Sequence, residues 1–214
     1  METIQRAWQY ALENSDFFWE SLLIHLELSG IALALSILVC VPLGAWLARR
    51  LGVAPLVINS FNAVRVVPSL AILFLAFPYL GLGFDAALVA LTILAFPPVL
   101  INSYAAFHGV DRAVIEAARG MGMSPWQLLR RIEFPLALPI IMTGIRTAAV
   151  EVIASAALAA FIGAGGLGDF VLRGFAVRRT DIMLVGAIPI ALLALVAEIL
   201  LSALQRQLAV PEAR

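Results

Sequence analysis

Lysine is missing from this chain of 214 residues, and all fourteen basic residues are arginine. A phosphate-binding P-loop needs a lysine and Schiff-base chemistry needs an amine, so neither kind of site is expected in this chain. Cys40 is the one cysteine, which excludes an intrachain disulfide and a cysteine metal cluster. Charged residues make up 13% of the chain and the formal net charge is zero, which argues against a nucleic-acid-binding surface.

Apolar residues dominate instead: they make up 63% of the chain, and the mean hydropathy is +1.01. A soluble domain of this size does not need so much apolar surface, so lipid is the expected solvent for most of it. Each span needs about 20 apolar residues. We therefore expect an all-α membrane protein with five transmembrane helices, placed at about 22–47, 54–79, 84–107, 136–162 and 182–204.

The segment 1–21 mixes acidic residues with aromatic ones, without the positive start and small-residue cleavage site of a secretory signal. We interpret it as an interfacial segment whose aromatic side chains lie at the membrane surface. His25, at the outer edge of the first span, is interpreted as interfacial too. Eight arginines lie on the side of the loop 108–135 and of the tail 205–214, against four on the other side. The positive-inside rule then predicts an N-terminus outside and a C-terminus in the cytoplasm.

A polar island from 108 to 135 interrupts the apolar chain between the third and fourth spans. Its pattern predicts two short helices joined by a tight turn. Asp111 is placed to cap the first helix, and Gly120 and Gly122 are placed to end it.

The second helix of this island has a complete start signal. Ser124 is a good N-cap, Pro125 falls at the first helical position, and Gln127 stands three residues after the serine, as a capping box requires. We expect Pro135 to end the helix.

The island also carries a family motif: E-A-A, three residues, G, nine residues, I, one residue, L-P. Phe134 replaces the usual leucine, and the other positions match at every spacing. The matching residues are Glu116, Ala117, Ala118, Gly122, Ile132 and Pro135. The chain therefore resembles the membrane subunits of type I ABC importers, in which this motif is the EAA loop. The alternative interpretation is a solvated helical hairpin that joins two spans.

The resemblance implies a permease subunit of the bacterial cytoplasmic (inner) membrane, with no catalytic residues, cofactor or metal of its own. Two ATPase subunits would bind ATP and Mg²⁺, a second permease subunit, identical or related, would complete the path, and an extracytoplasmic binding protein would deliver the substrate. The EAA loop would dock on the ATPase and couple hydrolysis to transport. Besides the motif residues, the docking set includes Gly120, Trp126 and Arg130.

Two polar stripes inside the spans are candidates for the lining of the translocation path, because polar groups in hydrocarbon are costly and usually face protein or water. Their residues recur every three or four positions, which places each stripe on one helical face. The second span carries Asn59, Asn62, Arg65 and Ser69, and the fourth carries Thr143, Thr147, Glu151 and Ser155. Hydrogen bonds between helices, or the interface between two permeases, are the alternatives.

A glycine-rich stretch, FIGAGGLGDF at 161–170, follows the fourth span. It spells G-x-G-x-x-G, but it follows a membrane helix rather than a strand and has no βαβ unit around it, so a dinucleotide site is rejected. We expect a close-packed outer loop near the outer gate or the binding-protein docking surface. Its glycines are Gly163, Gly165, Gly166 and Gly168.

The segments NAVRVVPSLAILFLAFPYLGLG and AFIGAGGLGD resemble those of osmoprotectant permeases, which transport glycine betaine, choline or carnitine. Permeases for methionine or another amino-acid-like solute share the size and the glycine loop and are the alternative. A secondary transporter working without an ATPase is a third interpretation, but the sequence shows no clear repeat between its halves.

Overall fold

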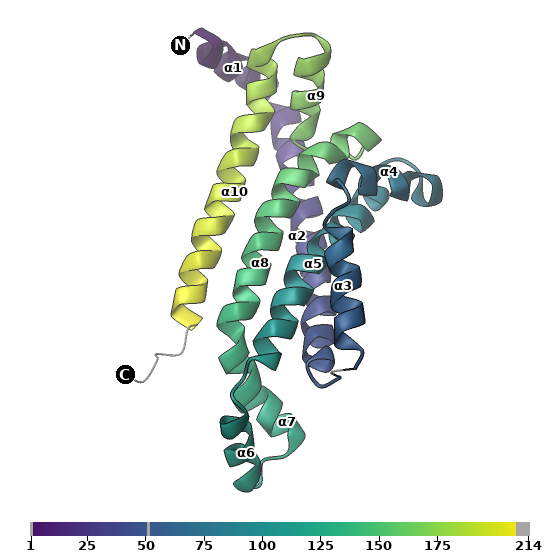
Figure 1. Ribbon diagram of the computed structural model, residues 1–214. Helices are drawn as coiled ribbons and strands as arrows, with labels where there is room; N and C mark the ends of the chain where they lie inside the picture. Colours follow the sequence, from purple (N-terminus) through teal and green to yellow (C-terminus); the bar gives the residue numbers. More distant parts are fainter. Residues whose placement is uncertain (1, 51, 209–214) are drawn as a thin grey trace.

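The computed structural model describes residues 2–50 and 52–208, and this part of the chain is a bundle of helices without a strand (Figure 1). Met1 and residues 209–214, the greater part of the expected cytoplasmic tail, lie outside the described residues. The helices in chain order are α1 Glu2–Glu13, α2 Ser15–Leu47, α3 Ala54–Val64, α4 Ser69–Leu80, α5 Phe84–His108, α6 Arg112–Gly120, α7 Pro125–Leu128, η1 Leu129–Glu133, α8 Phe134–Ala156, η2 Ala157–Ile162, α9 Gly168–Ala176 and α10 Thr180–Leu208.

Four helices of the described part are long and apolar enough to cross a membrane: α2, α5, α10 and the continuous helix Pro125–Ile162. The pair α3 and α4 makes a fifth span if it is counted as one. The sequence predicts the five apolar segments, but their ends differ. Helix α2 begins at Ser15 and has 33 residues, about 50 Å at 1.5 Å per residue, so it extends well beyond the ~30 Å hydrocarbon core.

The sequence predicts one continuous helix for the second segment, but the structure divides it into two helices. Helices α3 and α4 meet at an angle of 97°. The regular α-helical hydrogen bonds of α3 end in two tight turns. In these turns the N–H groups of Val66 and Val67 donate to the carbonyl oxygens three residues back, of Ala63 and Val64. Pro68 then has no N–H to continue the helix, and its ψ of 136° turns the chain into an extended conformation.

Helix α5 forms the centre of the bundle, with α2 and α8 packed against it. Glycines bring the backbones close together. A Cβ on Gly44 of α2 would lie 2.6 Å from the Cβ of Ser103, and one on Gly144 of α8 would lie 2.6 Å from the carbonyl oxygen of Pro98. Small residues are common at such contacts in membranes, because dispersion between close backbones replaces the missing hydrophobic driving force.

The two ends of the bundle carry different elements (Figure 1). The hairpin of α6 and α7 lies at one end, beyond the start of α8 and on the same side as the end of α10. Helices α1 and α9 lie at the opposite end, and α9 packs on α10. The sequence predicted a loop where α9 stands. The candidate coupling residues and the glycine-rich stretch are thus at opposite ends.

Candidate functional site

Hydrogen bonds between residues close in the sequence cap helix α6 at both ends. The Asp111 carboxylate accepts from the N–H of Ala113 at 2.8 Å, which confirms the predicted N-cap. At the other end Gly122 has a φ of +84°, and the N–H of Met123 bonds the carbonyl of Ala118 at 3.2 Å. These are the features of a Schellman motif, in which a left-handed residue closes the helix.

The turn therefore depends on Gly122 and not on Gly120, contrary to the expectation that both glycines form it. Gly120 is the last residue of α6 and lacks a positive φ. A Cβ added there meets no atom within 4 Å. Any residue that favours helices fits this position.

Helix α7 starts as its sequence predicts. The Ser124 hydroxyl accepts from the backbone N–H of Gln127 at 3.3 Å, and the side-chain oxygen Oε1 of Gln127 accepts from the backbone N–H of Ser124 at 2.9 Å. Pro125 occupies the first turn, so the predicted capping box is confirmed.

Pro135 does not end this helix, and the expectation that it would is wrong. Helix α7 continues through η1, a π-helical turn, into α8 without a break. The N–H of Phe134 bonds the carbonyl of Leu129, five residues back. Pro135 follows directly on this wider turn, at the beginning of α8, where a missing N–H and the proline ring are tolerated.

The residues of the EAA motif divide between an outer and an inner face. Glu116 and Ala117 are exposed, whereas Ala118, on the same helix α6, is buried. Ile132 and Pro135 are half-buried. Two further members of the expected docking set, Trp126 and Arg130, are exposed and line an apolar hollow of about 290 Å³ between the hairpin and α2. Trp126 keeps 66% of its surface exposed on this single chain.

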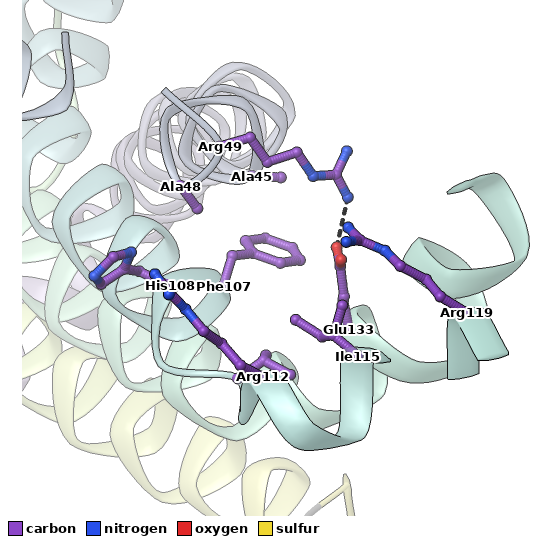
Figure 2. A pocket seen from close by; sticks show the side chains of 10 residues that line it. Ala45, Ala48, Arg49, Phe107, His108, Arg112, Ile115, Arg119 and Glu133 are labelled. Carbon is purple, nitrogen blue, oxygen red and sulfur yellow. Dashed lines mark hydrogen bonds and ion pairs between the residues drawn. The ribbon is translucent and has the colours of Figure 1, made fainter. Parts of the chain in front are cut away.

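Glu133 is a residue of this region that sequence reasoning missed. It is only 8% exposed, and its carboxylate accepts from Nη2 of Arg49, at the end of α2, at 2.5 Å (Figure 2). The pair lines a cavity of about 310 Å³. The other lining residues are Ala45, Ala48, Phe107, His108, Val110, Arg112, Ile115 and Arg119. An acidic residue at the very start of an apolar span was the available signal.

The first candidate stripe is interrupted by the break between α3 and α4. Asn59 and Asn62 lie on α3 and Arg65 caps its end, all exposed, but Ser69 begins α4 beyond the bend. The four residues therefore do not share one helical face, because the helix on which that face was drawn ends at Val64.

The second stripe lies on the continuous helix α8 and meets α10 along part of its length. Thr143 accepts a hydrogen bond from Nε2 of Gln205 at 2.9 Å, and Ser155 is buried. Thr147 and Glu151 line a shallow hollow beside α10. Arg65, of the first stripe, lies within range of an electrostatic interaction with Glu151.

Arg146 is a second residue that sequence reasoning missed. Its guanidinium is paired with the carboxylate of Glu198 and donates to the side chain of Gln205 at 2.6 Å. The amide of Gln205 also donates to the carbonyl oxygen of Pro139 at 2.7 Å. An arginine inside an apolar span was a signal in itself, since such a charge needs a partner in lipid. The cluster joins α8 to α10.

At the opposite end, the glycine-rich stretch packs tightly on α2 and on η2. A Cβ on Gly168 would lie 2.0 Å from the carbonyl oxygen of Ala157, and one on Gly166 would lie 3.5 Å from Nδ1 of His25. Gly163, like Gly165, has a positive φ. His25 itself is fully buried between α8 and the glycine-rich stretch, so the interpretation of it as an interfacial residue is wrong.

Two of the basic residues around α9, Arg173 and Arg179, have partners within the chain. The Arg173 guanidinium lies 4.1 Å from the ring centre of Phe17, and Nη2 of Arg179 lies 2.5 Å from a carboxylate oxygen of Asp181. Burial raises the pKa of the Asp169 carboxyl, and the positive charge of Arg173 opposes this shift. Within residues 2–50 and 52–208, no three His, Cys, Asp or Glu side chains gather as metal ligands.

Comparison with known proteins gives a family match for most of the chain. The model of the family described as "Binding-protein-dependent transport system inner membrane component" matches residues 40–210. The chain is 48% identical to the carnitine transport permease protein OpuCB of Listeria monocytogenes, over 89% of this chain and 88% of that protein. It is 42% identical to the glycine betaine/carnitine/choline transport system permease protein OpuCB of Bacillus subtilis, over 86% and 84%.

Among solved structures, the fold matches that of the methionine ABC transporter MetNI in an inward-facing conformation. The TM-score is 0.82, over 91% of this chain and 97% of the other, at 20% sequence identity. A likeness at this identity concerns the fold alone.

Proposed function

The chain belongs to the family of binding-protein-dependent transport system inner membrane components, and on this basis we propose that it forms the translocation path for a quaternary-ammonium osmoprotectant. It is a multi-pass permease subunit of the inner membrane, not an enzyme, and the ATPase of such a system is a separate subunit. Glycine betaine, choline and carnitine are the proposed substrates.

One observation carries the substrate proposal: 48% identity over 89% of the chain to a permease named for carnitine. A second relative, 41% identical over 86% of the chain, is named for choline. The methionine transporter shares the fold at 20% identity, which does not bear on the substrate. The osmoprotectants have a quaternary ammonium in common, and the external binding protein is the subunit expected to select it.

The family implies an ATPase and a binding protein as partners. We propose two ATPase subunits, which hold ATP and Mg²⁺, and a second permease subunit, identical or related. The exposed polar side chains of α3 and the half-buried Glu151 of α8 support a second chain, because polar groups at membrane depth need protein or water rather than lipid. Asn59, Asn62, Arg65, Thr147 and Glu151 are the proposed lining of the path between the two chains.

Coupling is proposed to run through α7 into α8. The exposed side chains of Trp126 and Glu116 suit docking on an ATPase, with an aromatic anchor and a charge for pairing. The unbroken helix from Pro125 to Ile162 supports direct transmission, since a displacement of α7 moves α8 as well. The proposed path residues Thr147 and Glu151 lie on this same continuous helix.

The proposed orientation puts the N-terminus outside, with the α6–α7 hairpin and the C-terminus in the cytoplasm. More arginines lie on the side of the membrane that carries the hairpin than on the other side. The hairpin must meet a cytoplasmic ATPase, and the glycine-rich stretch beside α9 then faces the binding protein. Gly163, Gly165, Gly166 and Gly168 are proposed to keep that surface compact near the outer gate.

The test is the ATPase activity of the reconstituted complex of permease and ATPase subunits, with the binding protein loaded in turn with glycine betaine, choline, carnitine and methionine. Stimulation by a quaternary amine is expected. Stimulation by methionine alone contradicts the substrate, and failure of any ATPase subunit to copurify contradicts the coupling role of the hairpin.

A further inference from the structure

We propose that the ion pair between Arg49 and Glu133 is a positioning element that ties the first span to the coupling helix, which is α7 with the turn η1 that follows it (Pro125–Glu133). Through this pair α2 moves with α7 and α8 during the transport cycle. This inference rests on the proposed function. Neither residue belongs to the EAA motif, and their positions are 84 residues apart in the sequence. The pair joins Arg49, two residues after the end of α2, to Glu133, the last residue of the π-helical turn.

The geometry sets Glu133 apart from the other charges at this end of the bundle. Its carboxylate is almost fully buried, and Nη2 of Arg49 approaches to 2.5 Å. The next residue, Arg50, instead lies over the ring of Trp46, 5.9 Å from its centre. Two adjacent arginines at the end of α2 thus have different partners, and one of them alone reaches the coupling helix.

The π-helical turn η1 is what directs Glu133 toward α2. A π turn inserts one residue into a helix, and each residue rotates the direction of the side chains by about 100°. Because Glu133 is the last residue of η1, this insertion determines the side of the helix on which its carboxylate lies. An uninterrupted α-helix from Pro125 would present that carboxylate elsewhere.

Two cavities lie beside the ion pair between Arg49 and Glu133. Cavities of about 310 and 300 Å³ are both lined by Arg49, Arg119 and Glu133. Figure 2 shows the Arg119 guanidinium, from α6, directed at the same carboxylate. The carboxylate therefore stands between a cation of the bundle, Arg49, and a cation of the hairpin, Arg119.

Separating Arg49 from Glu133 costs electrostatic free energy. A buried carboxylate that loses its cation keeps the cost of leaving water without the compensating attraction. A movement of α7 that left α2 behind would separate the two charges, so the lower-energy course is for α2 to follow. The pair gives the coupling hairpin a second connection to the spans, in addition to the continuous helix into α8.

The experiment compares Arg49→Gln, Glu133→Gln and the matched control Arg50→Gln in the complete complex with its ATPase and binding protein. Copurification reports assembly, and substrate uptake per ATP hydrolysed reports coupling. Coupling energies between linked sites correspond to factors of about 5 to 150, so we expect Arg49→Gln and Glu133→Gln to lower uptake per ATP at least about fivefold, while assembly persists. Arg50→Gln should match the wild type.

The exchange variant Arg49→Glu/Glu133→Arg tests whether the two residues act as an ion pair. We expect it to recover part of the lost uptake per ATP and not all of it, because Arg119 then faces a second arginine. Arg49→Gln with wild-type uptake per ATP overturns the inference. Should Glu133→Gln fail to assemble, Arg49→Gln decides, since its side chain is half exposed. A wild-type complex without ATP-driven uptake instead overturns the proposed function, and the inference with it.

Discussion

Nε2 of His25 lies 3.0 Å from the carbonyl oxygen of Ile153, which is 128 residues further along the chain. A backbone carbonyl only accepts, so Nε2 carries the hydrogen. Ile153 lies in the last turn of α8, directly before the tighter helix η2. The histidine therefore joins α2 to α8 at the point where that helix changes into η2, next to the glycine-rich stretch.

We predict that His25→Ala lowers the free energy of unfolding by about 1–3 kcal/mol, the cost of leaving a buried polar group without a partner. The matched control is His108→Ala, since His108 is exposed and stacks on Tyr104. Thermal unfolding of the detergent-solubilised permease measures both. Equal unfolding temperatures for the two variants would contradict the assignment.

The turn of the coupling hairpin supplies the second prediction. Gly122→Ala places a Cβ on a residue in the left-handed region, at a cost of about 1–2 kcal/mol to the local conformation. Assembly should remain largely intact, because no other part of the chain lies within 4 Å of that position. Uptake per ATP hydrolysed should fall. Gly120→Ala is the control and should be neutral, so impaired transport in both variants, or in neither, argues against this turn as a coupling element.

The cluster that joins α8 to α10 predicts a reciprocal effect. Arg146→Glu and Glu198→Arg should each lower the unfolding temperature by several degrees, because like charges then face one another where lipid and protein screen poorly. The double exchange restores opposite charges and should recover most of the loss. Differential scanning measurements on the four proteins form a double-mutant cycle, and additive losses in the double variant would exclude a direct interaction.

The proposed path is open to a chemical test, because Cys40 is the one cysteine and is buried. In a Cys40→Ala background, cysteines placed singly at Asn62, Thr147 and Glu151 should react rapidly with a charged methanethiosulfonate. The thiolate is the reactive form and needs water around it. A cysteine at Leu200, an exposed apolar position of α10, is the lipid-facing control and should react slowly. Slow labelling at all three polar positions would remove them from the path.

Local rules predicted the parts of the site that depend on neighbouring residues. The caps at Asp111 and Ser124 are set by side chains within three residues of the backbone groups that they bind, so sequence alone identifies them. The five apolar segments were likewise visible, because the length of a span is dictated by the bilayer.

Tertiary contacts decided the rest. Glu133 pairs with a residue 84 positions away, and Arg146 with one 52 positions away, which no local pattern encodes. Pro135 was misread because a π turn, invisible in the sequence, relieves the strain that proline causes in a regular helix. His25 looked interfacial from its place near the end of a span, yet the packing of α2 against α8 buries it.

The central claim is that this chain is the permease of an ATP-driven importer of quaternary amines. Uptake of labelled glycine betaine, choline or carnitine into liposomes that hold the complete complex, with the loaded binding protein on one side and ATP on the other, tests it most directly. We predict uptake of at least one of these solutes that stops when ATP is omitted or made non-hydrolysable. Uptake that proceeds equally without ATP, or transport of methionine with none of the three amines, would contradict the account.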